Sequence, residues 1–80
     1  MEKYNCPCCG FKTFNREPNG TYDLCLVCFW EDDRIQLEEP DYEGGANKVS
    51  LNQAKANFKK YGACEKRFIE NVRLPKKDEK

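Results

Sequence analysis

The clearest hydrophobic pattern lies in the second half of the chain, where apolar residues recur at helical spacing. They are Leu51, Ala54, Phe58 and Tyr61, with lysines at several positions between them. Ser50 followed by Gln53 fits a capping box, in which each side chain bonds the backbone of the other residue. Gly62 supplies a helix stop, because glycine readily adopts the left-handed conformation that follows a helix. The sequence therefore predicts a helix over residues 50–62.

Two short stretches of aromatic and β-branched residues in the first half predict strands. They are residues 11–14 and 21–24, and Pro18-Asn19-Gly20 stands between them. Asn-Gly between two such stretches is a strong hairpin signal. We therefore expect a β-hairpin over residues 11–24.

The segments around these elements have weaker patterns. Residues 31–48 are acidic and interrupted by Pro40 and Gly44-Gly45, which predicts a loop; a loop of this length is usually functional or disordered. Residues 67–72 fit either a helical turn or a short strand. We expect one domain over residues 1–74 and a disordered charged tail over 75–80.

Size and composition indicate a fold that needs a stabilising cross-link, a metal or a partner. A chain of 80 residues buries a modest core, and domains of this size often depend on disulfides, a metal or a partner. The six cysteines could supply it, as metal ligands or as disulfides. No secretory signal and no apolar run of membrane-spanning length is visible, so we expect a cytoplasmic protein that does not enter a membrane. Reduced thiols favour metal binding over a disulfide framework, which is the alternative.

Four cysteines have the spacing of a metal site. They form two Cys-x-x-Cys pairs, Cys6 with Cys9 and Cys25 with Cys28, separated by about the interval of a four-cysteine zinc site. Each pair can form a tight turn, and Gly10 tolerates the positive φ needed after the first. Four thiolates fill the tetrahedral coordination of Zn²⁺, so we expect a structural zinc ion. Iron in a rubredoxin-like centre is the alternative, and it would imply electron transfer.

These features together predict a small metal-bound α+β fold. It consists of a zinc-ribbon or rubredoxin-like knuckle pair with a β-hairpin, followed by an acidic loop and a C-terminal helix. Two cysteines remain outside the quartet. Cys8 is interpreted as a buried or half-exposed thiol, and the alternative is that it serves as an alternative metal ligand or as a redox-active thiol beside the metal. Cys64 is interpreted as a small core residue.

Several motifs taken together resemble the bacterial cysteine-rich CPCC family over residues 4–75. They are Cys6-Pro7-Cys8-Cys9-Gly10, Cys25-Leu26-Val27-Cys28-Phe29-Trp30-Glu31-Asp32-Asp33, Gly44-Gly45-Ala46-Asn47 and Ser50-Leu51. The resemblance implies a small cytoplasmic protein of unestablished role, and it draws attention to Cys8 and to the acidic triplet. Trp30 is expected to cap the metal site and to pack on Phe58 and Tyr61. The triplet is interpreted as part of a solvated loop.

The distribution of charge bears on function. Between positions 31 and 43 the chain has seven acidic residues and one arginine, whereas lysine and arginine predominate from Lys48 onward. We expect a non-enzymatic zinc module that binds a partner protein. One alternative is a metal-dependent hydrolase that uses Glu31, Asp32 and Asp33, although the chain has no histidine to serve as general base.

The other alternative is a nucleic-acid-binding zinc ribbon. Its basic face would consist of Lys55, Lys59, Lys60, Lys66 and Arg67. The formal net charge of the chain is zero, whereas nucleic-acid-binding domains usually have a strong positive excess. The sequence therefore disfavours nucleic acid as the partner.

Overall fold

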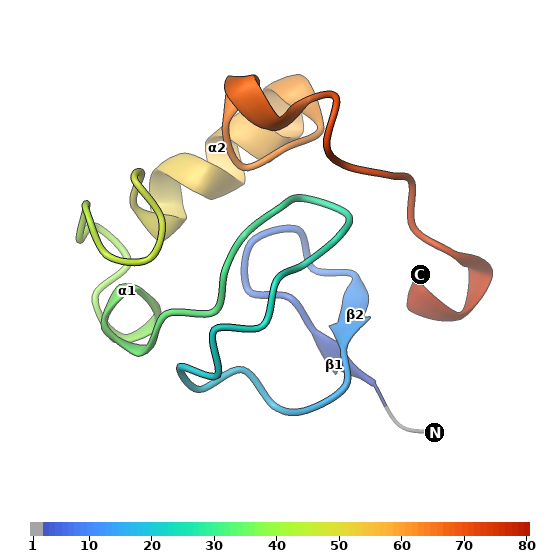
Figure 1. The fold of residues 1–80 in the computed structure, drawn as a ribbon, viewed down its shortest axis with the longest axis horizontal. Coiled ribbons are helices and arrows are strands. Elements are labelled where there is room, and N and C mark those ends of the chain that lie inside the picture. The colour runs from blue at the N-terminus through green and yellow to red at the C-terminus, as the bar shows by residue number, and fades with distance from the viewer. Residues whose placement is uncertain (1–2) are drawn as a thin grey trace.

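Two cysteine-bearing turns occupy the middle of the molecule, with a helix on one side and a small sheet on the other (Figure 1). The structure, a computed structural model, describes residues 3–80. Its elements are β1 (Tyr4–Asn5), β2 (Lys12–Phe14), α1 (Arg34–Glu38), α2 (Leu51–Tyr61) and two 3-10 turns, η1 (Lys66–Phe68) and η2 (Lys77–Glu79). The chain is thus a small α+β protein. No helix within residues 3–80 has the length and apolar character that crossing a bilayer demands.

The sheet pairs different residues from those that the sequence pattern indicated. β1 and β2 run antiparallel with Tyr4 opposite Phe14, so the first Cys-x-x-Cys turn itself forms the end of the hairpin. Residues 21–24 form no strand; they contribute one isolated bridge, between Leu24 and Glu31, which flanks the second turn. The predicted hairpin over residues 11–24 is therefore wrong. A cysteine turn closes each short pairing, so Asn19-Gly20 joins no pair of strands.

Helix α2 begins and ends as the sequence predicted. The Ser50 hydroxyl accepts a hydrogen bond from the Gln53 amide at 3.1 Å, and Gly62 follows the helix with a φ of 78°. The return bond of a capping box is replaced by another, because the Gln53 side chain donates to Asn57 at 2.8 Å. Asn57 in turn donates to the Cys64 carbonyl at 2.9 Å. This chain of bonds fixes the segment that leaves the helix.

The acidic segment contains a short helix where a loop was predicted. Asp33 caps α1 by accepting from the Gln36 amide at 3.0 Å, a bond typical of aspartate at a helix N-terminus. The Arg34 side chain pairs with Glu38 one turn later, at 3.2 Å. Residues 39–48 then return to the start of α2, where the Asn52 amide bonds the Pro40 carbonyl. The segment is therefore ordered by its own hydrogen bonds.

The C-terminal segment, for which the sequence predicts a disordered tail over residues 75–80, contains the 3-10 turn η2. Glu79 in η2 is buried, and both of its oxygens accept from the Arg73 guanidinium, at 2.7 and 2.9 Å. These bonds lower the pKa of Glu79 from 4.5 to about 2. Lys3 and Asp78 form a second pair at 3.4 Å, which holds η2 beside the first strand. For residues 67–72 the sequence leaves a helical turn or a short strand open; the structure has the end of the 3-10 turn η1 there, followed by a turn and no strand.

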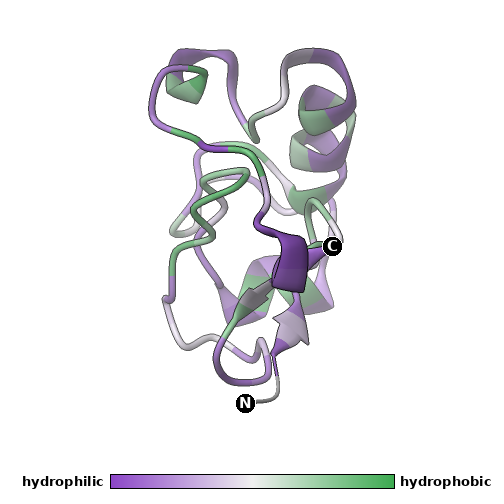
Figure 2. Cartoon of the chain, turned by 90° about the vertical axis from the view of Figure 1, so that its right-hand side faces the viewer, coloured by the Kyte–Doolittle hydropathy of each residue, from purple (hydrophilic) through white to green (hydrophobic). Residues whose placement is uncertain are grey.

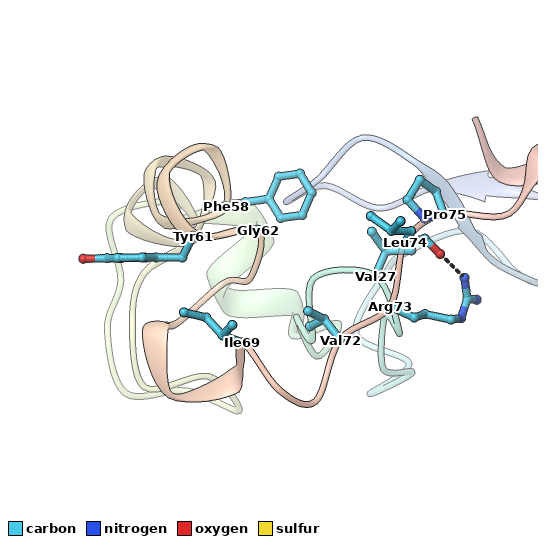
Figure 3. Close-up of a pocket in the computed structure, with 9 residues that line it drawn as sticks. All are labelled: Val27, Phe58, Tyr61, Gly62, Ile69, Val72, Arg73, Leu74 and Pro75. Carbon is cyan, nitrogen blue, oxygen red and sulfur yellow. Dashed lines mark hydrogen bonds between the residues drawn. The ribbon is translucent and has the colours of Figure 1, made fainter.

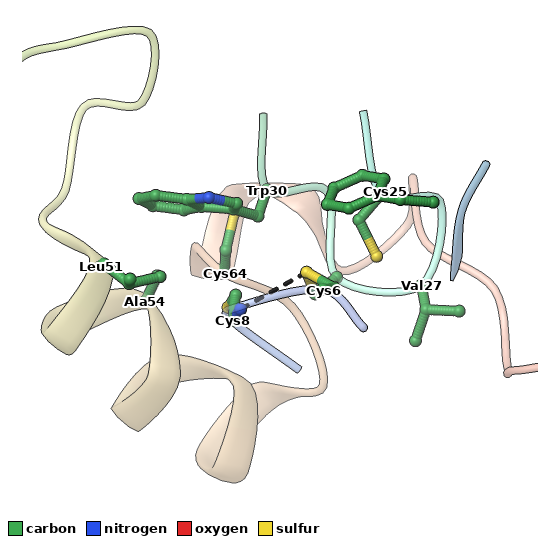
Figure 4. Packing of buried hydrophobic residues seen from close by; sticks show 10 residues of the cluster. Cys6, Cys8, Cys25, Val27, Trp30, Leu51, Ala54 and Cys64 are labelled. Carbon is green, nitrogen blue, oxygen red and sulfur yellow. Dashed lines mark hydrogen bonds between the residues drawn. The ribbon is translucent and has the colours of Figure 1, made fainter. Parts of the chain in front are cut away.

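The core consists of the cysteine turns and the inner face of α2. Cys6, Cys25, Cys28, Trp30, Leu51, Ala54 and Cys64 are all nearly inaccessible to solvent. In Figure 4 the Trp30 ring lies over Leu51, Ala54 and Cys64. Phe58 packs edge-on against Phe11 at 6.3 Å between ring centroids, so it joins α2 to the first turn. With so few apolar side chains, the sulfur cluster is a large part of the core.

Candidate metal centre

The four cysteines of the two Cys-x-x-Cys pairs converge on a single point. The Sγ atoms of Cys6, Cys9, Cys25 and Cys28 all lie within 4.8 Å of one another. Cys6 and Cys28 are 3.6 Å apart between sulfurs, and Cys9 and Cys25 are 3.7 Å apart. A tetrahedral ion with metal–sulfur bonds of about 2.3 Å requires sulfurs roughly 3.8 Å apart. Their positions thus suit one tetrahedral ion, and the four cysteines could bind a metal.

The two turns that present these sulfurs have the same internal hydrogen bonds. In the first, the Cys6 amide donates to the Phe11 carbonyl at 2.8 Å, and the Cys6 carbonyl accepts from the Gly10 amide at 2.9 Å. In the second, the Cys25 amide donates to the Trp30 carbonyl at 2.8 Å, and the Cys25 carbonyl accepts from the Phe29 amide at 2.7 Å. Each pair of sulfurs is therefore held by a backbone loop of fixed geometry.

One backbone position in each turn requires a left-handed conformation. Gly10 has a φ of 82°, as predicted from its lack of a side chain. Phe29 occupies the equivalent position with a φ of 73°, which is unfavourable for a residue with a Cβ atom. The Phe29 ring lies 4.8 Å from the Phe68 ring between centroids. The contact between these two tilted rings packs η1 against the second turn.

Hydrogen bonds from neighbouring groups reach the sulfurs. The Cys8 amide points to the Cys6 sulfur at 3.4 Å (Figure 4), and the Thr13 hydroxyl donates to the Cys25 sulfur at 3.0 Å. Such donors stabilise negative charge on a thiolate. Within the cluster, the hydrogen bond with Cys25 raises the pKa of Cys28, and the same bond lowers the pKa of Cys25. Four ionised sulfurs at these distances repel one another strongly, so full ionisation requires a cation among them.

Cys8 and Cys64 lie beside this quartet but outside it. All six cysteines are free thiols, so the structure contains no disulfide framework. Cys8 is 8 % exposed and Cys64 is 1 % exposed, and both belong to the apolar cluster under α2. Burial raises the pKa of Cys64 to about 12, so this thiol stays protonated. The interpretation of both residues as buried thiols agrees with these positions.

The sequence pattern of the family described as Cysteine-rich CPCC matches residues 4–79. The chain belongs to this family. A search among curated proteins found no match. The matched region includes both cysteine turns, the acidic segment and all of α2, so the whole described fold is the CPCC unit.

Asp32 of this CPCC chain is an anchor for the backbone. Its side chain is fully buried, and its Oδ2 atom accepts from the amides of Asn19, Gly20 and Thr21 at 2.8 to 2.9 Å. The Thr21 hydroxyl donates to the same oxygen at 2.9 Å. The Asn-Gly turn therefore wraps a carboxylate instead of joining two strands. Asp32 Oδ1 has no hydrogen-bond partner among residues 3–80.

Asp33 and Gln36 hold the glycine-rich part of the acidic segment. Asp33 Oδ2 accepts from the Ala46 amide at 2.8 Å. The Gln36 side chain is fully buried and donates to the carbonyls of Tyr42, Asn47 and Val49 at 3.0 to 3.1 Å. A Cβ atom on Gly45 would lie 2.8 Å from Asp33 Oδ2, so only glycine fits at this position.

Asn47 connects this network to the second cysteine turn. Its side-chain oxygen accepts from the Glu31 amide at 2.9 Å, and its side-chain nitrogen donates to the Glu31 carbonyl at 2.7 Å. The same nitrogen donates to Gln36 at 3.0 Å. The segment Trp30-Glu31-Asp32-Asp33 and the segment Gly44-Gly45-Ala46-Asn47 therefore act as the two halves of one buried polar joint.

The interpretation of the acidic triplet as a solvated loop is wrong for two of its three residues. Asp32 and Asp33 are 0 % and 7 % exposed, because they satisfy backbone amides that would otherwise lack partners. Sequence reasoning missed Gln36 entirely, since nothing marks a single glutamine in an acidic segment as buried. The one available signal was the paired occurrence of the triplet and the Gly-Gly-Ala-Asn motif.

Proposed function

We propose that this protein is a small structural-zinc module that presents a metal-organised surface to a partner protein. The observation that carries the first part is the sulfur quartet. Cys6, Cys9, Cys25 and Cys28 place four ligands at the separations of one tetrahedron. Four thiolates leave a zinc ion no open position for water or substrate, so the ion serves the fold.

Zinc is proposed over iron on the grounds of compartment and ligand set. A reducing cytoplasm keeps six cysteines as thiols, and four thiolates suit the tetrahedral preference of Zn²⁺. The same ligands suit iron, which gives a strongly coloured centre. Elemental analysis of protein purified without added metal separates the two. We expect about one zinc per chain and a colourless solution; a red solution that contains iron overturns the assignment.

The acidic triplet argues for a binding role over a catalytic one. Asp32 Oδ2 accepts hydrogen bonds from three backbone amides, and the two oxygens of Asp33 accept from one backbone amide each. Among residues 3–80 the one group of side chains arranged to hold a metal ion is the four-cysteine cluster, and the acidic triplet is not part of it. A hydrolase built on Glu31, Asp32 and Asp33 would have to break this joint in order to bind a second ion.

Surface composition supports the partner role. Several large apolar side chains remain exposed, among them Leu26, Ile69 and Leu74. Clusters of exposed apolar side chains on a small domain mark interaction sites more often than chance positions. The surface charge is divided between an acidic segment and a basic half, which favours oriented association with a charged partner.

A matched pair of substitutions tests the structural metal. Cys9→Ser removes one ligand, whereas Cys64→Ser alters a buried thiol outside the quartet. We expect Cys9→Ser to lose most of its bound zinc and its dispersed amide NMR spectrum, because metal-binding energy is folding energy in such domains. Cys64→Ser should keep one zinc per chain. Equal zinc content in both variants contradicts the assigned ligands.

A further inference from the structure

An open apolar groove lies between the end of α2 and the C-terminal segment. Its volume is about 320 Å³. Its apolar lining, drawn in Figure 3, comes from Phe58 and Tyr61 of α2, from Val27, and from the C-terminal residues Ile69, Val72, Leu74 and Pro75. Figure 2 shows that the C-terminal segment crossing this face has hydrophobic stretches before it ends in the hydrophilic turn η2. The groove is thus built from three separate parts of the chain.

The second cysteine turn positions the groove. Val27, one of the two residues between Cys25 and Cys28, is buried and forms its floor. On either side of that floor, the Cys64 amide bonds the Cys28 carbonyl at 2.7 Å and the Arg73 amide bonds the Leu26 carbonyl at 3.1 Å. The C-terminal segment is therefore attached to the turn that presents two of the metal ligands. Loss of the metal should therefore make both Val27 and the attached C-terminal segment more mobile.

Several large apolar side chains in and beside the groove are exposed. Leu74 is 86 % exposed and Ile69 is 44 % exposed in the groove lining, and Leu26, next to Val27 in the second cysteine turn, is 50 % exposed. Four of the seven large apolar residues that are most exposed, counting Leu24, surround this C-terminal segment. Exposure of this kind is unfavourable for an isolated domain and is relieved when a partner covers it.

The part of the chain that forms most of the groove has an excess of positive charge. From position 58 to position 79 it has seven lysines and arginines and four acidic residues. Arg67 and Arg73 pair with Glu65 and Glu79, whereas the lysines of this stretch form no salt bridge within residues 3–80. Lys60 lies 5.3 Å from the centroid of the Tyr61 ring, at the edge of the groove. A partner that fills this groove would therefore gain from carboxylates beside its apolar side chains.

We propose that the groove binds an acidic segment of a partner protein that inserts large apolar side chains over Val27. The proposal rests on the proposed interaction role and adds the surface and the chemistry of the partner. Apolar lining disfavours nucleic acid, whose backbone and base edges are polar. Positive charge at the rim disfavours a basic partner.

Selection from a random peptide library displayed on phage, against the zinc-loaded protein, provides the probe. We expect enriched peptides that combine at least two large apolar residues with net negative charge. Amide NMR shifts on addition of one synthetic enriched peptide should concentrate at Val27, Tyr61 and residues 69–75. Enriched peptides with net positive charge overturn the proposal, and so do shifts that lie outside the groove.

Substitutions at exposed positions then measure the contribution of the groove. Leu74→Glu should weaken the peptide at least about tenfold, since it removes buried apolar area and adds a like charge. Leu74→Met, which keeps the apolar surface, should stay within about threefold of the parent. Ile35→Glu is the matched control, because Ile35 is 51 % exposed on α1 outside the groove lining. Equal effects of Leu74→Glu and Ile35→Glu contradict the proposal.

Two further measurements separate this proposal from its rivals. If a short duplex or single-stranded oligonucleotide binds in a Leu74-dependent manner, the partner class is wrong. Light scattering that shows a dimer disrupted by Leu74→Glu assigns the groove to a second copy and also overturns the proposal. Peptides that bind the zinc-loaded protein elsewhere refute the groove and leave the interaction role standing. A protein that folds and binds without zinc refutes the proposed zinc module instead.

Discussion

Replacing Asp32 by asparagine tests the claim that the acidic triplet is structural. The buried Asp32 oxygen accepts four hydrogen bonds, three from backbone amides and one from the Thr21 hydroxyl. Hydrogen bonds to a charged group contribute about 1.5–3 kcal/mol each, compared with about 0.5–1.5 for neutral pairs. Asparagine keeps the shape and the acceptor, and because four donors share one oxygen each bond loses less than the full difference between these ranges, roughly 0.5–1 kcal/mol.

Two other effects act in opposite directions. The neutral amide is less costly to bury than a carboxylate, which offsets part of the loss. However, the amide nitrogen takes the place of Oδ1, which has no hydrogen-bond partner among residues 3–80, and becomes an unsatisfied donor. We therefore expect Asp32→Asn to lower the free energy of unfolding by about 2–3 kcal/mol, out of the 5–15 kcal/mol typical of a small domain.

Urea denaturation of the zinc-loaded protein, at a fixed excess of free zinc, measures this change. A loss of about 2–3 kcal/mol should lower the urea midpoint by roughly 1–2 M with an unchanged slope. Asp41→Asn is the control, since the exposed Asp41 accepts one hydrogen bond, from Asn52, and should change stability by less than about 0.5 kcal/mol. If both variants unfold at the same urea concentration, the role of Asp32 as a backbone anchor is refuted.

Three further predictions follow from single contacts. Gly45→Ala should destabilise the protein by about 1–3 kcal/mol in the same urea assay, because the new methyl group would lie 2.8 Å from Asp33 Oδ2; an unchanged midpoint contradicts this. Cys8→Ser should retain one zinc per chain by elemental analysis whereas Cys28→Ser should not, and loss of zinc from Cys8→Ser would instead make Cys8 a ligand. The pKa of Glu79 in the folded chain is about 2, below its ordinary 4.5, so this carboxylate stabilises the fold above pH 4.5 and ceases to do so as the pH falls toward 2. Glu79→Gln should therefore lower stability by up to about 1 kcal/mol at pH 7 and by progressively less in acid; a difference that does not change with pH refutes the ion pair.

The sequence predicted the parts of the fold that depend on local signals. Helix α2 has a capping serine, a helical apolar period and a terminal glycine, and each acts within a few residues of its own position. The sulfur quartet could be expected for a similar reason, because two residues between paired cysteines define a turn. The four sulfurs do lie together in the structure, and the cysteine spacing was the one feature of the sequence needed to expect this.

The missed features depend on contacts between distant residues. Asn19-Gly20 has the composition of a hairpin turn, yet its amides bind a carboxylate more than ten positions later. The burial of Gln36 depends on carbonyls of Asn47 and Val49, which local propensity does not reveal. Glu79 was assigned to a disordered tail because a charged C-terminus usually is one, but its partner Arg73 holds it against the fold.

The central claim is that one ion bound by Cys6, Cys9, Cys25 and Cys28 organises a chain whose apolar core is too small to do so. The most direct test is the amide NMR spectrum of the reduced protein before and after a strong chelator removes all bound metal. We predict that the dispersed spectrum collapses on chelation and returns after addition of one equivalent of Zn²⁺. A spectrum that keeps its dispersion in the fully metal-free, reduced protein would contradict the account.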